Sequence, residues 1–150
     1  MNIRKANKFD LPHIIEMLKH FREQTPIPQM ANCDNHEYIN TLYHHLILGG
    51  GLALVAETDK PIGMIMGIKN SSIWDPQIIE LRELVFWVEP EHRGSTAGYR
   101  LLKEYIKQAN ELVNENKITL HTMTKMTNSP DLDFSRFGYK KTEEVWVGGI

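Results

Sequence analysis

The segment from residue 79 to residue 114 constrains the fold of this chain more than any other part of its sequence. Residues 79–88 are dense in branched and aromatic side chains, which favour a β-strand, and Pro90 ends that strand because proline cannot donate to a ladder. Residues 94–98 are all small, and apolar side chains then recur at helical spacing to about residue 114. The sequence therefore predicts a strand, a tight loop and a long amphipathic helix in direct succession.

A loop of this kind exposes backbone N–H groups to which an anion can bind. The first N–H groups of a helix have no partners within the helix, and the helix dipole adds about half a positive charge there. Small side chains let a phosphate approach those amides closely. The segment has neither the Gly-Lys-Ser/Thr of a P-loop nor the GxGxxG of a dinucleotide fold. We therefore expect a phosphate or pyrophosphate site at residues 93–98.

The remaining residues predict a mixed order of helices and strands. Helices are expected at residues 10–22, 35–48 and 129–137, and strands at residues 3–6, 52–57, 62–68, 117–123 and, once or twice, within 140–147. Residues 24–35 contain two prolines and are expected to form an irregular loop. Glycines at 49–51 and at 138 are expected to end the helices that precede them. This order excludes a strictly alternating Rossmann-type repeat.

Length, charge and cysteine content exclude several classes of protein. A chain of 150 residues suits a single domain, residues 1–150. Its 17 basic and 19 acidic residues give a net charge of −2, unlike the strongly basic charge of a dedicated nucleic-acid binder. The longest apolar stretch, residues 46–56, is too short to span a bilayer. A single cysteine, Cys33, cannot form an internal disulfide. We expect a cytoplasmic protein with no metal site.

The run Val88-x-Pro90-x-x-Arg93-Gly94-x-x-x-Gly98-x-x-Leu101-Leu102 resembles the signature of the GNAT N-acetyltransferase superfamily, in which R/Q-x-x-G-x-G/A binds the pyrophosphate of coenzyme A. The predicted element order and the pair Gly138-Tyr139 also agree with that family, and the chain is similar to short members encoded by bacteriophages. The resemblance implies a GNAT-like α/β (mixed α+β) fold, with a central, mostly antiparallel sheet of six to seven strands flanked by helices. It also implies acetyl-coenzyme A as cosubstrate and an amine acceptor, and it leaves a homodimer open.

The resemblance implies a set of coenzyme-binding residues: Val88, Arg93, Gly94, Ser95, Thr96, Ala97, Gly98, Tyr99 and Asn128. In this set a backbone N–H near Val88 serves the thioester carbonyl. The chain departs from the motif at Thr96, which stands where the first motif glycine is expected. The hydroxyls of Ser95 and Thr96 can donate to phosphate in its place. With a net charge of −2, the grip on the coenzyme has to come from oriented amides and a few residues such as Arg93 and Arg100.

Acetyl transfer to an alkylammonium needs a base, because a group with a pKa of about 10.4 must lose a proton before it can attack. The resemblance points to carboxylates on the strand before the loop, and Glu80 and Glu83 lie there on opposite faces. We favour Glu83, since it is nearer the loop and its apolar neighbours can raise its pKa. The alternative is a solvated or ion-paired Glu83, with Arg82 or Arg4 as its partner.

A second departure concerns the proton donor. The family often has a tyrosine four residues before the terminal glycine, acting as general acid toward the departing thiolate, and Phe134 stands there in this chain. Water, Tyr139 or Ser129 remain as donors. Two functions are therefore weighed: direct N-acetyl transfer to a primary amine on a small molecule or protein, and a catalytically weak coenzyme A-binding or protein-interaction module.

Other side chains allow both a functional and an ordinary interpretation. His121 either lines the cleft as an acid or base or is a hydrogen-bonded strand residue. Trp87 and Trp146 are expected in the core or at an interface. Five residues are expected to form either one wall of an acceptor pocket or an ordinary packed loop: Phe21, Pro26, Ile27, Pro28 and Met30.

Overall fold

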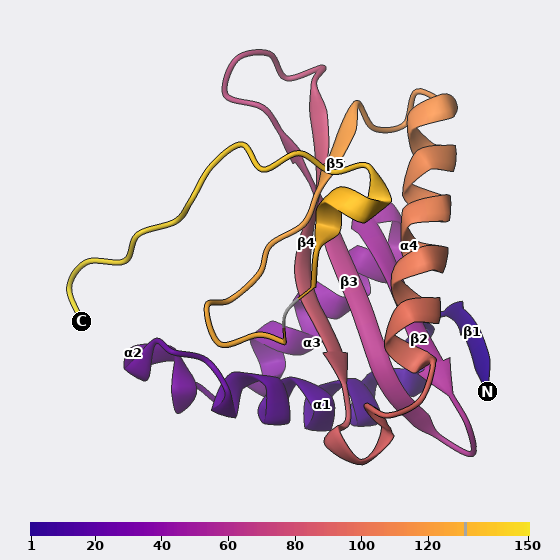
Figure 1. The fold of residues 1–150 in the computed structure, drawn as a ribbon, viewed down its shortest axis with the longest axis vertical. Helices are drawn as coiled ribbons and strands as arrows, with labels where there is room; N and C mark the ends of the chain where they lie inside the picture. Colours follow the sequence, from indigo (N-terminus) through magenta and orange to yellow (C-terminus); the bar gives the residue numbers. More distant parts are fainter. Residues whose placement is uncertain (131) are drawn as a thin grey trace.

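The computed structural model describes residues 1–130 and 132–150. Its strands and α-helices, in chain order, are β1 (Asn2–Lys5), α1 (Leu11–Glu23), α2 (Pro28–Ala31), α3 (His36–His45), β2 (Gly51–Glu57), β3 (Pro61–Ser71), β4 (Ile79–Val88), α4 (Ala97–Asn114) and β5 (Leu120–Thr122) (Figure 1). The long strand and the long helix predicted on either side of the small-residue loop are confirmed at both ends. In the described residues, none of the helices combines the length and the hydrophobicity that a membrane span requires.

The strands form one sheet in the order β1-β2-β3-β4-β5, antiparallel throughout except for the parallel pair β4 and β5. The mixed, mostly antiparallel sheet is confirmed, but the expected six to seven strands are wrong, since the described residues form five. Residues 140–147 are not strands: they are exposed and run away from the sheet toward α2 (Figure 1). Four of its eight residues are charged and fall on both faces of an extended chain, and Lys141 pairs with Glu144 of the same segment at 2.6 Å. Such a segment has no apolar face to bury against a sheet.

Helices cover both faces of the sheet (Figure 1). Helix α4 buries Leu101, Leu102 and Tyr105 against one face. On the other face, α1 and the segment from α3 to Leu46 bury Ile14, Tyr43 and Leu46. Because β4 contributes side chains to both cores, it runs through the middle of the molecule.

Glycines end two helices as expected. After α3, residues 46–50 form a π-helical turn in which Gly49 adopts a φ of +106°, a conformation that other residues rarely take. Near the C-terminus, Gly138 has a φ of +87° and follows a 3₁₀ turn, Phe134–Phe137.

Three boundaries predicted from the sequence are wrong. The short C-terminal helix begins at Phe134 rather than at residue 129, because the Asp133 side chain accepts a capping hydrogen bond from the Ser135 N–H at 3.0 Å. Asp131, part of the expected start, lies outside the described residues. Within the expected loop at 24–35, Pro28 opens the helical turn α2. The strand expected at 117–123 is confined to Leu120–Thr122.

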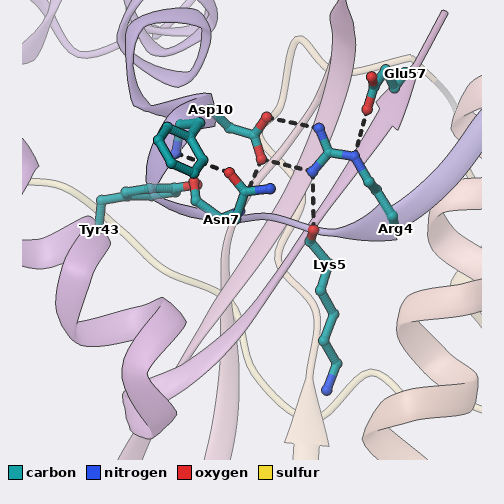
Figure 2. Close-up of polar contacts among 7 residues, drawn as sticks. Arg4, Lys5, Asn7, Asp10, Tyr43 and Glu57 are labelled. Carbon is teal, nitrogen blue, oxygen red and sulfur yellow. Dashed lines mark hydrogen bonds and ion pairs between the residues drawn. The ribbon is translucent and has the colours of Figure 1, made fainter.

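A buried polar network joins β1, β2, α1 and α3 (Figure 2). Two guanidinium nitrogens of Arg4 each donate to Asp10 at 2.8 Å, and a third donates to Glu57. The Asn7 N–H also donates to Asp10 at 2.8 Å, and the Tyr43 hydroxyl donates to the Asn7 carbonyl at 2.6 Å. Burial alone would raise the pKa of Asp10, but these hydrogen bonds outweigh it and hold that pKa below its ordinary value.

Candidate functional site

The parallel strands β4 and β5 are paired over only three residues. Glu80, Leu81 and Arg82 of β4 face residues 120–122, and β4 then continues to Val88. A bulge lies just beyond the paired part: Glu83 faces Gly67 and Val85 faces Met66, so Leu84 is the extra residue. The two strands therefore diverge at Glu83, and the outer edge of β4 is open from there to the small-residue loop.

Backbone groups of β4 point into this opening. The Glu89 N–H donates to the Ile62 carbonyl of the neighbouring hairpin at 2.8 Å. In an antiparallel pair, hydrogen-bonded residues alternate with residues whose backbone groups face outward, so the groups of Phe86 and Val88 point away from β3. The Val88 carbonyl accepts from Arg93 Nε at 2.9 Å. The Val88 N–H thus faces the open edge.

The loop between β4 and α4 is braced by its own side chains. The guanidinium of Arg93 lies 4.4 Å from the centre of the Trp87 ring while its Nε donates to Val88. The Ser95 hydroxyl donates to the His92 carbonyl at 2.6 Å and accepts from the Ala97 N–H at 3.2 Å. Arg93 and Ser95 therefore stabilise the loop. The Ser95 hydroxyl, which was expected to donate to phosphate, instead donates its hydrogen to the His92 carbonyl of the loop.

The cradle, defined here as residues 93–98, has glycines that the packing of the chain does not explain. A Cβ added at Gly94 would meet no atom within 4 Å, and at Gly98 only the side chains of Val88 and Phe86 at 3.7 and 3.8 Å. Neither glycine has a positive φ. Space is therefore free beside the loop and the start of α4, where the Thr96 side chain caps no amide and the Ser95 hydroxyl accepts from that of Ala97. The space and the amides fit a diphosphate group.

Three other residues that were expected to hold the coenzyme have contacts within the chain. Tyr99 is 57 % exposed and its ring packs against Phe137 at 6.3 Å between centroids. The Asn128 amide donates to the Gln24 carbonyl at 2.6 Å, which ties the segment after β5 to the end of α1. Arg100 donates to the Met1 carbonyl at 3.1 Å.

Glu83 lies at the point where the strands diverge and is only 4 % exposed. Its Oε2 accepts from the N–H and the hydroxyl of Thr124, at 3.2 and 2.7 Å. Burial raises the pKa of Glu83, and these two hydrogen bonds only partly offset that rise. Arg4, one expected partner, instead pairs with Asp10 and Glu57. Glu80 accepts from the Thr122 hydroxyl at 2.8 Å within the paired part of the strands.

Aromatic and polar side chains gather beside Glu83. Its charge raises the pKa values of Tyr105 and Tyr139, although burial is the larger cause for both, and Tyr139 reaches about 12. His121 lies 2.7 Å from the Tyr139 hydroxyl through Nδ1 and 2.8 Å from Asn110 Oδ1 through Nε2. Burial lowers the pKa of His121, so the neutral ring is favoured, with its hydrogen on Nε2 facing the Asn110 oxygen.

Sequence reasoning missed Thr124, Asn110 and Tyr105. The last two sit on a helix whose period indicates only a packed face, and Thr124 lies beyond the strand that positions it. The expected core position of Trp87 is confirmed, with 7 % of its surface exposed, whereas Trp146 is 87 % exposed. Phe134, at the family's usual tyrosine position, packs beside Tyr139 with ring centroids 6.1 Å apart.

Comparison with solved structures shows that other proteins share this fold. A crystal structure of a predicted acetyltransferase from Clostridium acetobutylicum with acetyl-CoA superposes with a TM-score of 0.71 at 15 % identity, over 98 % of this chain and 94 % of that one. A Trypanosoma brucei acetyltransferase gives 0.69 at 14 % identity, over 99 % of both chains. The putative acetyltransferase yncA of Salmonella typhimurium, with its cofactor acetyl-CoA, gives 0.62 at 25 % identity, over 74 % of this chain and 64 % of that one.

No curated protein sequence matches the chain. The family model described as acetyltransferase (GNAT) family matches residues 14–139, which include β4 with Glu83, the cradle and α4. The chain therefore belongs to the acetyltransferase (GNAT) family.

Proposed function

We propose that the protein transfers an acetyl group from acetyl-coenzyme A directly to a primary amine, on a small molecule or on a protein lysine or N-terminus. The observation that carries the proposal is the position of Glu83. Its buried carboxylate lies where β4 and β5 diverge, between the open edge of β4 and residues able to exchange protons. Solved relatives that hold acetyl-CoA support the choice of cosubstrate.

The coenzyme side of the site is made mainly of backbone groups. Acetyl-coenzyme A supplies an activated acetyl thioester. The amides of the cradle would hold its diphosphate, helped by the dipole of α4. The Val88 N–H, which faces the open edge, would donate to the acetyl carbonyl as negative charge develops on it. Arg93 and Trp87 keep the loop and the end of β4 in register, which fixes the distance between these two groups of donors.

Glu83 would accept the proton of the acceptor ammonium, directly or through one water molecule. Its raised pKa makes it a stronger base than an exposed carboxylate, and Thr124 holds one of its oxygens in place. Glu80 serves less well, because its carboxylate is hydrogen-bonded in the paired part of the strands.

Tyr139 would donate to the departing sulfur. At neutral pH its phenol keeps its proton, since its pKa is raised to about 12, first by burial and then by the charge of Glu83. Once Glu83 has taken up a proton, that charge is neutralised and the phenol becomes more acidic. Proton uptake at Glu83 thus favours proton release from Tyr139. The neutral His121 ring accepts from the phenol through Nδ1, so the hydroxyl would rotate from His121 toward the sulfur as it donates.

Phe134 favours a second candidate function, a catalytically weak module that binds coenzyme A or a protein, because the family's usual donor is missing at that position. Two measurements separate the candidates: the thermal shift given by acetyl-coenzyme A, and thiol release from it in the presence of amines. The acetyltransferase requires both, whereas the weak module gives the shift without turnover by any amine, polyamine or lysine peptide.

A matched pair of variants tests the cradle. Gly98→Glu should abolish the thermal shift, since it places bulk and negative charge beside the diphosphate. Gly148→Glu adds the same side chain to an exposed glycine with open space around it and should keep the shift. A normal shift in Gly98→Glu would show that the coenzyme binds elsewhere.

A further inference from the structure

A cavity of about 670 Å³ opens between the helices on the face of the sheet opposite α4. Helices α1, α2 and α3 form its walls, and Leu84 and Val85 of β4 lie at its inner end. Of the five residues expected as a pocket wall, Phe21 and Met30 line it, while Pro26, Ile27 and Pro28 are not among its lining residues. Its volume lies within the range of about 300 to 1,000 Å³ that is typical of pockets for small molecules.

The inner end of the cavity lies beside Glu83 along β4, because Leu84, which lines the cavity, directly follows Glu83 at the bulge. Val85 belongs to the core on the α1 and α3 face, and Leu84 is the extra residue that separates it from Glu83. The Glu83 carboxylate itself influences Tyr105 on the α4 face, so an amine at the inner end of the cavity would reach it across the open edge of β4. A molecule that fills the cavity would present its amino group there.

The walls are mainly apolar, with Leu18, Phe21, Met30 and Leu42 facing the same space as Leu84 and Val85. The two acidic residues of the lining, Glu16 and Asp34, are matched in number by Lys19 and Arg22. Asp34 lies 2.7 Å from His36 and 3.8 Å from Arg22, and His20 lies 2.9 Å from Glu89. A polycation would find little uncompensated negative charge on these walls, whereas an apolar body would be removed from water along most of its surface.

We infer that the acceptor is a small primary amine attached to a bulky apolar or aromatic group, rather than a polyamine, an amino sugar or a lysine side chain. This inference rests on the proposed function, because it names the substrate class of that same site. The apolar group would lie among Leu18, Phe21 and Leu42, and the amino group beside the β4 bulge.

Two amines that share a two-carbon chain test the inference. 2-Phenylethylamine and ethanolamine differ in a phenyl ring against a hydroxyl, and thiol release measures kcat/KM for each. Burial of the ring in the cavity predicts a kcat/KM at least tenfold higher for 2-phenylethylamine. Ethanolamine, spermidine or a lysine peptide matching or exceeding it would overturn the inference while leaving the acetyltransferase proposal intact.

Variants at the cavity mouth add a readout that does not depend on turnover. Met30 is 54 % exposed, so Met30→Glu should fold normally and weaken 2-phenylethylamine binding at least fivefold, measured by saturation-transfer NMR in the presence of coenzyme A. Leu48→Glu makes the same kind of change at an 81 % exposed residue that does not line the cavity, and should leave binding unchanged. Equal binding to both variants overturns the inference. Binding that Met30→Glu weakens, without thiol release from any amine, supports the pocket and overturns the proposed function instead.

Discussion

Asp10 and Glu83 expose the same small fraction of their surface, 4 % each, yet their pKa values move in opposite directions. Asp10 accepts two hydrogen bonds from the Arg4 guanidinium and one from a backbone N–H. Glu83 accepts two hydrogen bonds, both from Thr124 and both to one oxygen. A cation at hydrogen-bonding distance compensates the burial of one carboxylate, and no such cation is bonded to the other among the described residues.

This difference separates a structural carboxylate from one suited to proton transfer. The Asp10 network (Figure 2) lies at the side of the sheet where all four residues of β1 pair with β2. Glu83 lies on the side where β4 and β5 diverge. A charge that is desolvated and weakly compensated destabilises the fold, which is a common property of catalytic groups.

The largest expected effect comes from removing the cation of the structural network. Arg4→Met leaves Asp10 buried without its partner. We expect the free energy of unfolding to fall by about 2 to 3 kcal/mol, less than the roughly 3 to 5 kcal/mol of a fully buried pair because Arg4 is 28 % exposed. Urea denaturation measures the change. Lys141→Met, which breaks an exposed ion pair, should leave the unfolding midpoint unchanged. Equal effects of the two variants would contradict a structural role for Arg4.

Removing the charge of Glu83 should change the catalytic rate strongly and the stability very little. Glu83→Gln keeps an oxygen for Thr124, so stability should be unchanged or slightly higher, while kcat at pH 7 should fall about 100-fold. Thiol release and the acetyl-coenzyme A thermal shift measure the two properties, and the shift should persist. Glu80→Gln is the matched control and should lower kcat less than threefold. A rate for Glu83→Gln equal to that of the control would remove Glu83 as the base.

Local patterns predicted much of the fold. Strand β4, the cradle and α4 follow from propensity and period, which act within a few residues. The prediction of C-terminal strands was wrong because a strand needs a neighbouring strand to pair with. Residues 140–147 pair with no described strand, and their charged side chains remain in water. The position of Glu83 followed from strand period, but its partner Thr124 lies 41 residues away, and only the divergence of β4 from β5 brings the two together.

A smaller effect is expected from the proposed proton donor. Tyr139→Phe removes the phenol beside His121, and we expect kcat to fall about tenfold with the acetyl-coenzyme A thermal shift unchanged. Phe134→Tyr, introduced into Tyr139→Phe, places a phenol at the family's usual position in contact with the same aromatic group and should restore part of the rate. Full activity of Tyr139→Phe would assign the proton to water or Ser129.

The smallest expected effect is the pH dependence of stability, which tests the contrast between Asp10 and Glu83 most directly. The pKa of Glu83 is raised above 4.5, so over some pH range the folded state keeps a proton that the unfolded chain has already lost. The stability of the wild type relative to Glu83→Gln should therefore decline as the pH rises from about 4.5 to the pKa of Glu83 in the folded protein. The pKa of Asp10 is held below 3.8, so its contribution is complete above that pH and is lost as the pH falls. Each slope is limited to about 1.4 kcal/mol per pH unit, the value for one proton. Urea denaturation from pH 3 to pH 8 of the wild type, Glu83→Gln and Asp10→Asn should place the two changes on opposite sides of about pH 4. Two changes on the same side would show that both carboxylates are compensated alike, and that Glu83 is structural.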